Sequence, residues 1–111
     1  MARAAALGFD IGTTSVKAGL LWLDADEPMT VVGHAHPTSR PHPGWVEQDP
    51  ADWIAGMAAC WGQLQRSVGP VELRSVGVCS QVNTHLFLGT DGRPLRPAIT
   101  WQDTRAAAVA A

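Results

Sequence analysis

Apolar and polar residues alternate near the amino terminus in a pattern that predicts two strands joined by a tight turn. Residues 5–10 are mostly apolar, residues 12–14 interrupt the run, and apolar side chains return at every second position over 16–23. A period of two with two fairly apolar faces is typical of a well-covered strand. A turn at 24–28 and a segment rich in Thr and Val at 29–36 add a third strand. Because the connections are short, we expect an antiparallel meander.

The hydrophobic period changes after a segment at 37–44 that carries three prolines and is predicted to be a loop. Between Trp53 and Val68, apolar residues recur every three or four positions, as on the buried stripe of an amphipathic helix. Asp49 suits the N-cap and Pro50 the first helical position. The Gly-Pro pair that follows Val68 is expected to end the helix.

The remaining elements are shorter. Residues 73–80 read as a fourth strand, and 85–88 and 97–100 as a fifth and a sixth, joined around the turn signal Asp91-Gly92. Residues 103–111 are expected to form a helix capped by the aspartate at its start. The order strand, strand, strand, helix, strand predicts an α/β fold with a mixed sheet.

Composition narrows the class of protein. The 111 residues suit one domain, and 46% hydrophobic with 16% charged residues argues against intrinsic disorder. A net charge of -2 without a basic patch argues against a nucleic-acid partner. No apolar run approaches the roughly 20 residues of a membrane span, and Met1 to Leu7 is too short for a signal peptide. We therefore expect a cytoplasmic protein in which Cys60 and Cys79 are buried thiols rather than a disulfide.

The most informative stretch surrounds the first predicted turn. Gly12 allows unusual backbone angles and close approach of a ligand, and the amides of such a turn can form an anion-binding nest. Thr13 and Thr14 add hydroxyl donors, and Lys17 adds a positive charge beyond the turn. Asp10 ends its strand where a carboxylate can hold Mg²⁺, usually through water. The stretch predicts a phosphate-binding hairpin.

A simpler alternative is a solvent-facing hairpin whose glycine and threonines merely suit a turn. Two other phosphate motifs are excluded. The run Gly-x-x-x-x-Gly-Lys-Ser/Thr of a P-loop is missing, and no helix opens after the glycines as in a dinucleotide-binding fold.

The pattern Gly8-x-Asp10-x-Gly12-Thr13-Thr14-Ser15-x-Lys17 resembles the first phosphate motif of the FGGY carbohydrate kinases, which include glycerol kinase, xylulokinase and gluconokinase. The resemblance implies a ribonuclease H-like fold of the actin and hexokinase type, with ATP and Mg²⁺ as cofactors. The first domain of that family opens with the strand order predicted above.

Three further segments resemble the family in the same order along the chain. Residues 44–53 are similar to its Gly-Trp-x-Glu-Gln-(Asp/Asn)-Pro-x-x-Trp segment. We interpret this segment as a helix entry in which Trp45 packs against the helix like a hydrophobic staple, and we assign it no chemistry.

Residues 76–81 resemble the strand that carries a glutamine, here Gln81, into the sugar site. Glycerol kinases continue with Arg-Glu and xylulokinases with Met-His, whereas this chain has Val82-Asn83. Asn83 can donate to and accept from sugar hydroxyls. His85 either reaches a ligand or is a partly buried structural residue.

Residues 91–105 resemble the family pattern of a turn, an apolar strand and Trp-x-Asp-x-Arg. The resemblance implies that Trp101 flanks the sugar, since an indole face suits the C–H side of a polyol. Its alternative role is an ordinary core anchor. Asp103 is a candidate substrate ligand, and helix capping together with an ion pair to Arg105 is the equally weighted alternative.

The FGGY kinases are several times longer and have two large domains. The resemblance therefore implies that residues 1–111 are a partial amino-terminal domain, with the second domain and the general-base aspartate lying beyond Ala111. We expect the full-length parent to phosphorylate a sugar or polyol hydroxyl with ATP, and this chain alone to be inactive. The alternative is a non-catalytic fragment or pseudo-kinase domain that binds a ligand or partner, and another actin-like ATPase is a third possibility. The sugar is not identified, and an oligomer is possible.

Overall fold

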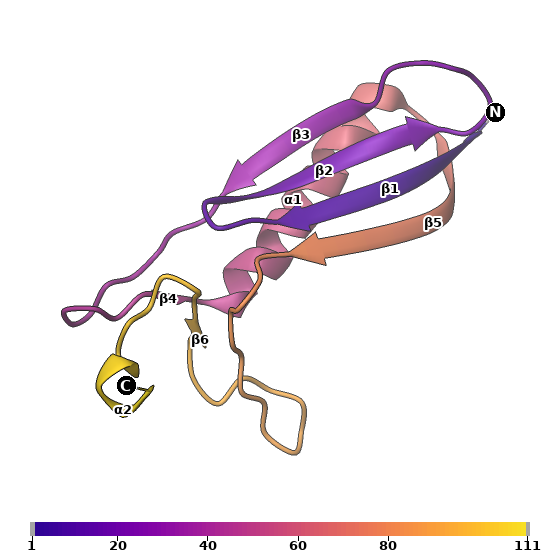
Figure 1. The fold of residues 1–111 in the computed structure, drawn as a ribbon. Coiled ribbons are helices and arrows are strands. Elements are labelled where there is room, and N and C mark those ends of the chain that lie inside the picture. Colours follow the sequence, from indigo (N-terminus) through magenta and orange to yellow (C-terminus); the bar gives the residue numbers. More distant parts are fainter. Residues whose placement is uncertain (1, 111) are drawn as a thin grey trace.

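A four-stranded mixed sheet with one long helix on one face forms the larger part of the chain (Figure 1). The computed structural model describes residues 2–110. The strand order is β3-β2-β1-β5, with the first three strands antiparallel and β5 parallel to β1. This topology confirms the predicted meander and crossover. The strands are β1 (Arg3–Ile11), β2 (Ser15–Trp22), β3 (Thr30–Ala35) and β5 (Val71–Ser80).

Helix α1 (Pro50–Val68) has the predicted start and end. The amide N–H of Ala51 donates to Oδ1 of Asp49 at 2.9 Å, so Asp49 is the N-cap. Gly69 ends the helix with φ 76°, a backbone angle that favours glycine. The cap and the stop place the apolar stripe of α1 against the sheet.

The hydrophobic core lies between α1 and the alternate residues of β1 and β2 that face it. Gly56 lets the helix approach β2 closely, because a Cβ at this position would lie 2.8 Å from Cγ2 of Val16. Of the two faces that the sequence pattern predicted to be covered, only the face carrying Val16, Ala18, Leu20 and Trp22 is buried in this chain. The core residues are Ala5, Leu7, Phe9, Val16, Ala18, Leu20, Trp22, Cys60 and Leu64.

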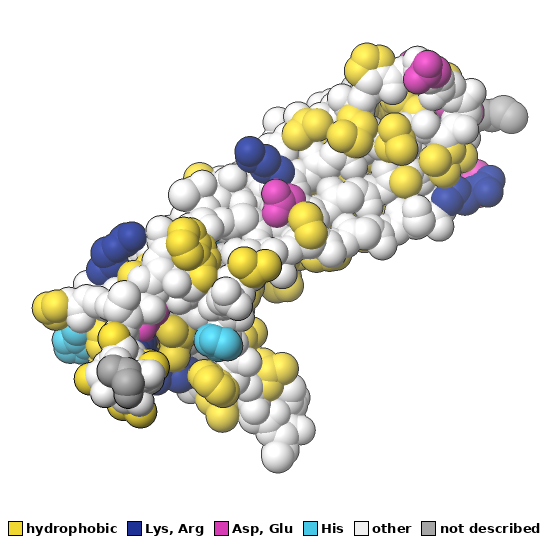
Figure 2. Space-filling view, in the orientation of Figure 1, with side chains coloured by type: hydrophobic (Ala, Val, Ile, Leu, Met, Phe, Trp, Pro, Cys, Tyr) yellow, Lys and Arg dark blue, Asp and Glu magenta, His cyan; other side chains and the backbone are white. Residues whose placement is uncertain are grey.

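The opposite face of the sheet is uncovered, and Figure 2 shows apolar side chains scattered over it. Gly8 pairs with Gly19 on one side and with Gly77 on the other, so a row without side chains crosses three strands. Both cysteines are free thiols, as predicted, but only Cys60 is buried. Cys79 is exposed on the uncovered face, so its predicted burial is wrong for this chain.

A smaller extension is attached at the far end of the sheet from the amino terminus (Figure 1). In it, β4 (Glu47–Gln48) pairs with β6 (Ala98–Ile99). The predicted strand at 85–88 is wrong, since only isolated bridges at His85 and Leu88 form. Prolines at 94 and 97 provide no N–H for a continuous ladder. The predicted turn is present, and Gly92 adopts φ 79° within it.

The predicted helix at 103–111 is also shorter than expected. Helix α2 is Ala107–Ala110, and Ala111 lies outside the described residues. Asp103 does not cap it, because its carboxylate binds Val46 and Arg105 instead. Within residues 2–110, no helix combines the length and the apolar composition needed to cross a bilayer.

Candidate functional site

The hairpin between β1 and β2 is a tight turn closed by a hydrogen bond from the amide of Gly12 to the carbonyl oxygen of Ser15, at 2.9 Å. A Cβ at Gly12 would lie 3.1 Å from that same oxygen. Glycine is therefore favoured here by the close approach of the backbone rather than by a positive φ.

Side chains from three distant segments hold the carbonyl groups of this turn. Nε2 of His36 donates to the carbonyl oxygen of Gly12 at 2.9 Å, and Nε2 of Gln81 donates to the same oxygen at 3.3 Å. Nε2 of Gln48 donates to the carbonyl oxygen of Thr13 at 2.7 Å. Both carbonyl groups are thus directed into the protein.

This arrangement fixes where the following amides point. In a trans peptide the C=O and the next N–H lie in one plane and point in opposite directions, and no peptide bond among the described residues is cis. The amides of Thr13 and Thr14 are therefore directed away from the protein, and among residues 2–110 no acceptor binds either of them. Two outward N–H groups in succession are the kind of donor arrangement that suits an anion.

Two charged residues stand beside the turn. Asp10 and Lys17 are exposed and lie opposite each other in the antiparallel register of β1 and β2. Neither takes part in an ion pair with another described residue. Partial burial and the adjacent Asp10 raise the pKa of the Cys79 thiol, so Cys79 stays protonated near neutral pH. The carboxylate and the ammonium remain available to a ligand.

Gln81 lies directly behind the turn, where β5 ends. Its amide N–H donates to the carbonyl oxygen of Ile11 at 3.0 Å, and its side chain contacts Gly12, Gln48 and Thr84. Both hydrogens of Nε2 are used within the protein, so towards a sugar Gln81 can offer only its carbonyl oxygen.

Trp101 reaches the hairpin from the extension. Its Nε1 donates to Oγ1 of Thr13 at 2.9 Å, across 88 positions of sequence. The side chain is half exposed, at 50%, so it is not a core anchor of this chain. The hydrogen bond fixes the indole beside the turn between β1 and β2.

Asn83 lies in an exposed turn just after Gln81, with φ 54°, a left-handed angle that asparagine tolerates. His85 is exposed as well, and its backbone bridges to Ile99. Neither side chain is hydrogen-bonded to another described residue. The structure therefore leaves both free rather than joining them to the hairpin.

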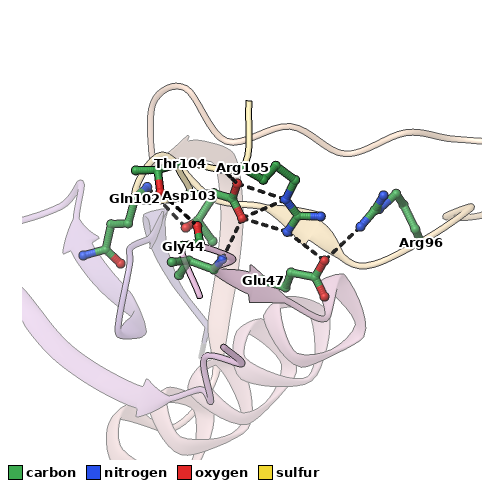
Figure 3. A network of polar contacts seen from close by, with 9 residues as sticks. Gly44, Glu47, Arg96, Gln102, Asp103, Thr104 and Arg105 are labelled. Carbon is green, nitrogen blue, oxygen red and sulfur yellow. Dashed lines mark hydrogen bonds and ion pairs between the residues drawn. The ribbon is translucent and has the colours of Figure 1, made fainter. Parts of the chain in front are cut away.

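Asp103 belongs to a buried network of charges that joins the two strands of the extension (Figure 3). Its side chain is 3% exposed, and it accepts from the amide of Val46 at 2.6 Å and from Arg105 at 2.7 Å. Arg105 also binds Glu47 at 2.9 Å, as does Arg96. The predicted ion pair between Asp103 and Arg105 is thus present.

The guanidinium groups shift both carboxyl groups towards the ionised form. Hydrogen bonds from Arg105 hold the pKa of Asp103 far below its usual range, against the opposing effect of burial. Arg105 and then Arg96 lower the pKa of Glu47 in the same way. The network carries its charges at neutral pH and fixes the segment at 96–105, which carries Trp101.

Trp45 contributes to this network rather than to the entry of α1. The guanidinium of Arg105 lies 3.9 Å from the centre of its ring, and His42 meets the ring edge-on. The staple positions around the N-cap are taken instead by Gln48 and Trp53, joined by a hydrogen bond of 3.0 Å.

Sequence reasoning gave no role to His36 or Gln48, although both hold the hairpin. Gln48 stood in a motif that had been interpreted only as a helix entry. His36 directly follows β3 and belongs to no motif, so the only signal was its place just after a strand that pairs with β2.

The mixed sheet, the crossover helix and the turn between β1 and β2 define the class of ATPase folds that includes actin and hexokinase. The model of the FGGY family of carbohydrate kinases, N-terminal domain, matches residues 5–111. The chain belongs to this family.

Sequence relatives and solved structures of known name are consistent with this family. A glycerol kinase of Thermus brockianus is 41% identical over 106 residues, covering 93% of this chain and 21% of its own length. A xylulose kinase of Escherichia coli (strain K12) is 34% identical over 101 residues, covering 91% of this chain and 21% of its own length. The crystal structure of xylulose kinase from Rhodospirillum rubrum matches with a TM-score of 0.86 and 32% identity, covering 94% of this chain and 22% of that one. The chain spans about a fifth of the length of these relatives.

Proposed function

We propose that the protein carrying this chain transfers the γ-phosphoryl group of MgATP to a hydroxyl group of a sugar or polyol. The observation that carries the proposal is the pair of outward amides at Thr13 and Thr14, which no acceptor within residues 2–110 binds, flanked by Asp10 and Lys17. The names of the glycerol and xylulose kinases among its relatives support the acceptor class.

The hairpin supplies what a polyphosphate needs. Gly12 leaves room for close approach, and the amides and hydroxyls of Thr13 and Thr14 donate to phosphate oxygens. Lys17 adds positive charge from β2. Phosphoryl transfer depends mainly on positioning and on electrostatic stabilisation, so a rigid set of donors is the main contribution of this chain.

Asp10 fits the role of a magnesium tether. Its carboxylate is a hard oxygen ligand, it is exposed, and it is free of ion pairs within residues 2–110. The same region gathers no group of three or more His, Cys, Asp or Glu side chains. A single carboxylate suits Mg²⁺, which keeps several waters and takes its other ligands from phosphate. When bound, the ion neutralises negative charge on the phosphates.

The sugar side is formed by the extension and the end of β5. Trp101 offers an indole face, Asn83 offers its side-chain amide, and Oε1 of Gln81, which already accepts from Thr84, offers its second acceptor position. The oxygens of Asp103 are taken by Val46 and Arg105, so its contribution is to fix the segment that carries Trp101.

The experiment measures ADP release by the full-length protein over a panel of pentuloses, hexuloses and polyols. We expect release to depend on one acceptor class, and Asp10→Ala to lower kcat by about 100-fold. The matched control is Asp26→Ala, an exposed aspartate in the loop after β2, which is expected to leave the rate unchanged. A wild-type rate in Asp10→Ala would refute the role of Asp10, and release independent of any acceptor would refute the kinase proposal.

For the 111-residue chain by itself we propose binding without turnover, as a partial amino-terminal domain whose partner domain belongs to a longer protein. The share of the relatives that it spans, about 21%, favours this proposal. Titration with MgATP and acceptor sugars is expected to show weak binding and no ADP. Turnover by the chain alone would overturn it.

A further inference from the structure

Gln48 is a fully enclosed amide at the centre of the candidate site. Its side chain is among the largest in the chain that are completely buried, and the residue is 2% exposed. It ends β4, immediately before the N-cap of α1, so its backbone is held by two elements. A buried polar side chain has to be hydrogen-bonded to be tolerated.

All four hydrogen-bonding positions of this amide are used. Nε2 donates to the carbonyl oxygen of Thr13 at 2.7 Å and to Oγ1 of Thr38 at 3.0 Å. Oε1 accepts from Nε1 of Trp53 at 3.0 Å and from Nε2 of Gln81 at 2.9 Å. The contact with Thr13 is the shortest of the four.

Two of these contacts fix the orientation of the amide towards Thr13. The acceptor bonds from Trp53 and Gln81 determine which end of the amide carries the oxygen, so the nitrogen end faces Thr13. Because the carbonyl of Thr13 is held there, the amide of Thr14 points outward.

We propose that Gln48 is a positioning residue for phosphate binding, which orients the outward amide of Thr14 without touching the ligand. The inference rests on the proposed function, because it assigns to the hairpin the phosphate that the proposed reaction needs. The proposal assigns the segment at 44–53 a role in phosphate binding, in addition to its role at the start of α1.

The chemistry of the side chain makes glutamine specific at this position. A glutamate of the same length would accept from Trp53 and Gln81, but when ionised it has no hydrogen for the carbonyl of Thr13. A methionine fills similar space and offers neither donor nor strong acceptor. These two substitutions separate the loss of the donor from the addition of a charge.

The test measures the dissociation constant of MgADP for the full-length protein between pH 5 and pH 8. Gln48→Met is expected to weaken binding about tenfold at every pH, since it leaves the hairpin carbonyl unpaired. Gln48→Glu is expected to bind almost as well as wild type at low pH, where the carboxyl is protonated and donates. Its affinity falls with rising pH, and burial places this transition above the usual carboxyl pKa of about 4.3.

Two controls separate positioning from folding. Gln63→Glu makes the same change on the exposed side of α1 and is expected to bind MgADP like wild type at every pH. Leu64→Ala removes a buried side chain of the hydrophobic core. It is expected to lower the melting temperature while the folded protein keeps its affinity.

The wild-type protein provides a readout that needs no variant. The indole N–H of Trp53 donates to Gln48, so its NMR signal is expected to shift when MgADP binds, whereas that of Trp61, packed against the core, is not. Wild-type affinity in Gln48→Met, or a Trp53 signal unmoved by saturating MgADP, would overturn the positioning role. A wild-type protein that binds no MgADP would refute the proposed function itself, and this inference with it.

Discussion

Thr13 is the residue at which the two sides of the candidate site meet. Its carbonyl group is held by Gln48, its hydroxyl accepts from Trp101, and its amide faces outward. Since the hydroxyl oxygen accepts from the indole, its own hydrogen stays free to donate to a ligand. Thr13 therefore links the buried side-chain amide of Gln48, the half-exposed indole of Trp101 and the outward amides of the turn.

Asp103 shows how a single buried carboxylate couples the extension to pH. The pKa of Asp103 in the folded protein lies below its unfolded value, about 3.9 for an aspartate. A group whose pKa is depressed by folding contributes stability above the unfolded value, and that contribution is lost as the pH falls through the folded value. Stability is therefore expected to decline as the pH drops below about 4.

The variant Asp103→Asn tests this expectation, because an amide does not titrate. It is expected to be less stable than wild type at pH 7 and to lose less stability between pH 5 and pH 2, in urea unfolding followed by tryptophan fluorescence. Asp26→Asn, at an exposed site, serves as the control and should follow the wild-type curve. Parallel curves for wild type and Asp103→Asn would show that the network carries no pH-dependent stability.

At the scale of elements, the contact of α1 with β2 depends on one glycine in the middle of a helix. Gly56→Ala is expected to destabilise the protein by about 1–3 kcal/mol, because its Cβ would collide with Val16. Gly62→Ala is the matched change in the same helix, and there the nearest atom is the mobile end of Arg66 at 3.3 Å. It is expected to be neutral or to stabilise by up to about 1 kcal/mol. Equal unfolding midpoints for the two variants would contradict the close-packing explanation.

The elements that sequence reasoning predicted well are those with a strong local pattern. β1, β2 and α1 carry their period and their caps within a few residues, so neighbouring positions were sufficient to locate them. The helix at 103–111 was overestimated because Asp103, which was expected to cap it, binds Val46, 57 positions away, instead. The strand at 85–88 was overestimated because the prolines that face it interrupt the ladder.

The residues of the candidate site also divide into those with a local sequence signal and those without one. Asp10, Gly12 and Lys17 could be proposed as candidates from the sequence because the residues of a turn are adjacent along the chain. The supporting contacts of His36 and Gln48 with the turn span 24 and 35 positions. Hydrophobic periodicity carries no information about such long-range contacts. They could therefore not be predicted from the sequence and are seen only in the folded structure.

The whole molecule is elongated, with extents of 57 × 30 × 21 Å and a radius of gyration of 17.1 Å. A compact domain of this length would have a radius of about 13 Å. The difference arises because the extension projects from the end of the sheet, on the side of the hairpin (Figure 1). This open arrangement also leaves one face of the sheet uncovered and the apolar side chains of Val76 and Val78 exposed.

The hydrogen bond between Trp101 and Thr13 has a consequence for how acceptors are chosen. In the proposed function this bond sets the distance between Trp101 on the acceptor side and the turn that would bind the nucleotide phosphates, and both of its partners lie within this chain. Substitutions around Asn83 can then alter which acceptor is admitted while the distance across which the phosphoryl group passes stays constant. Within the proposed function, the choice of acceptor and the alignment of the phosphoryl group with that acceptor can therefore be changed independently.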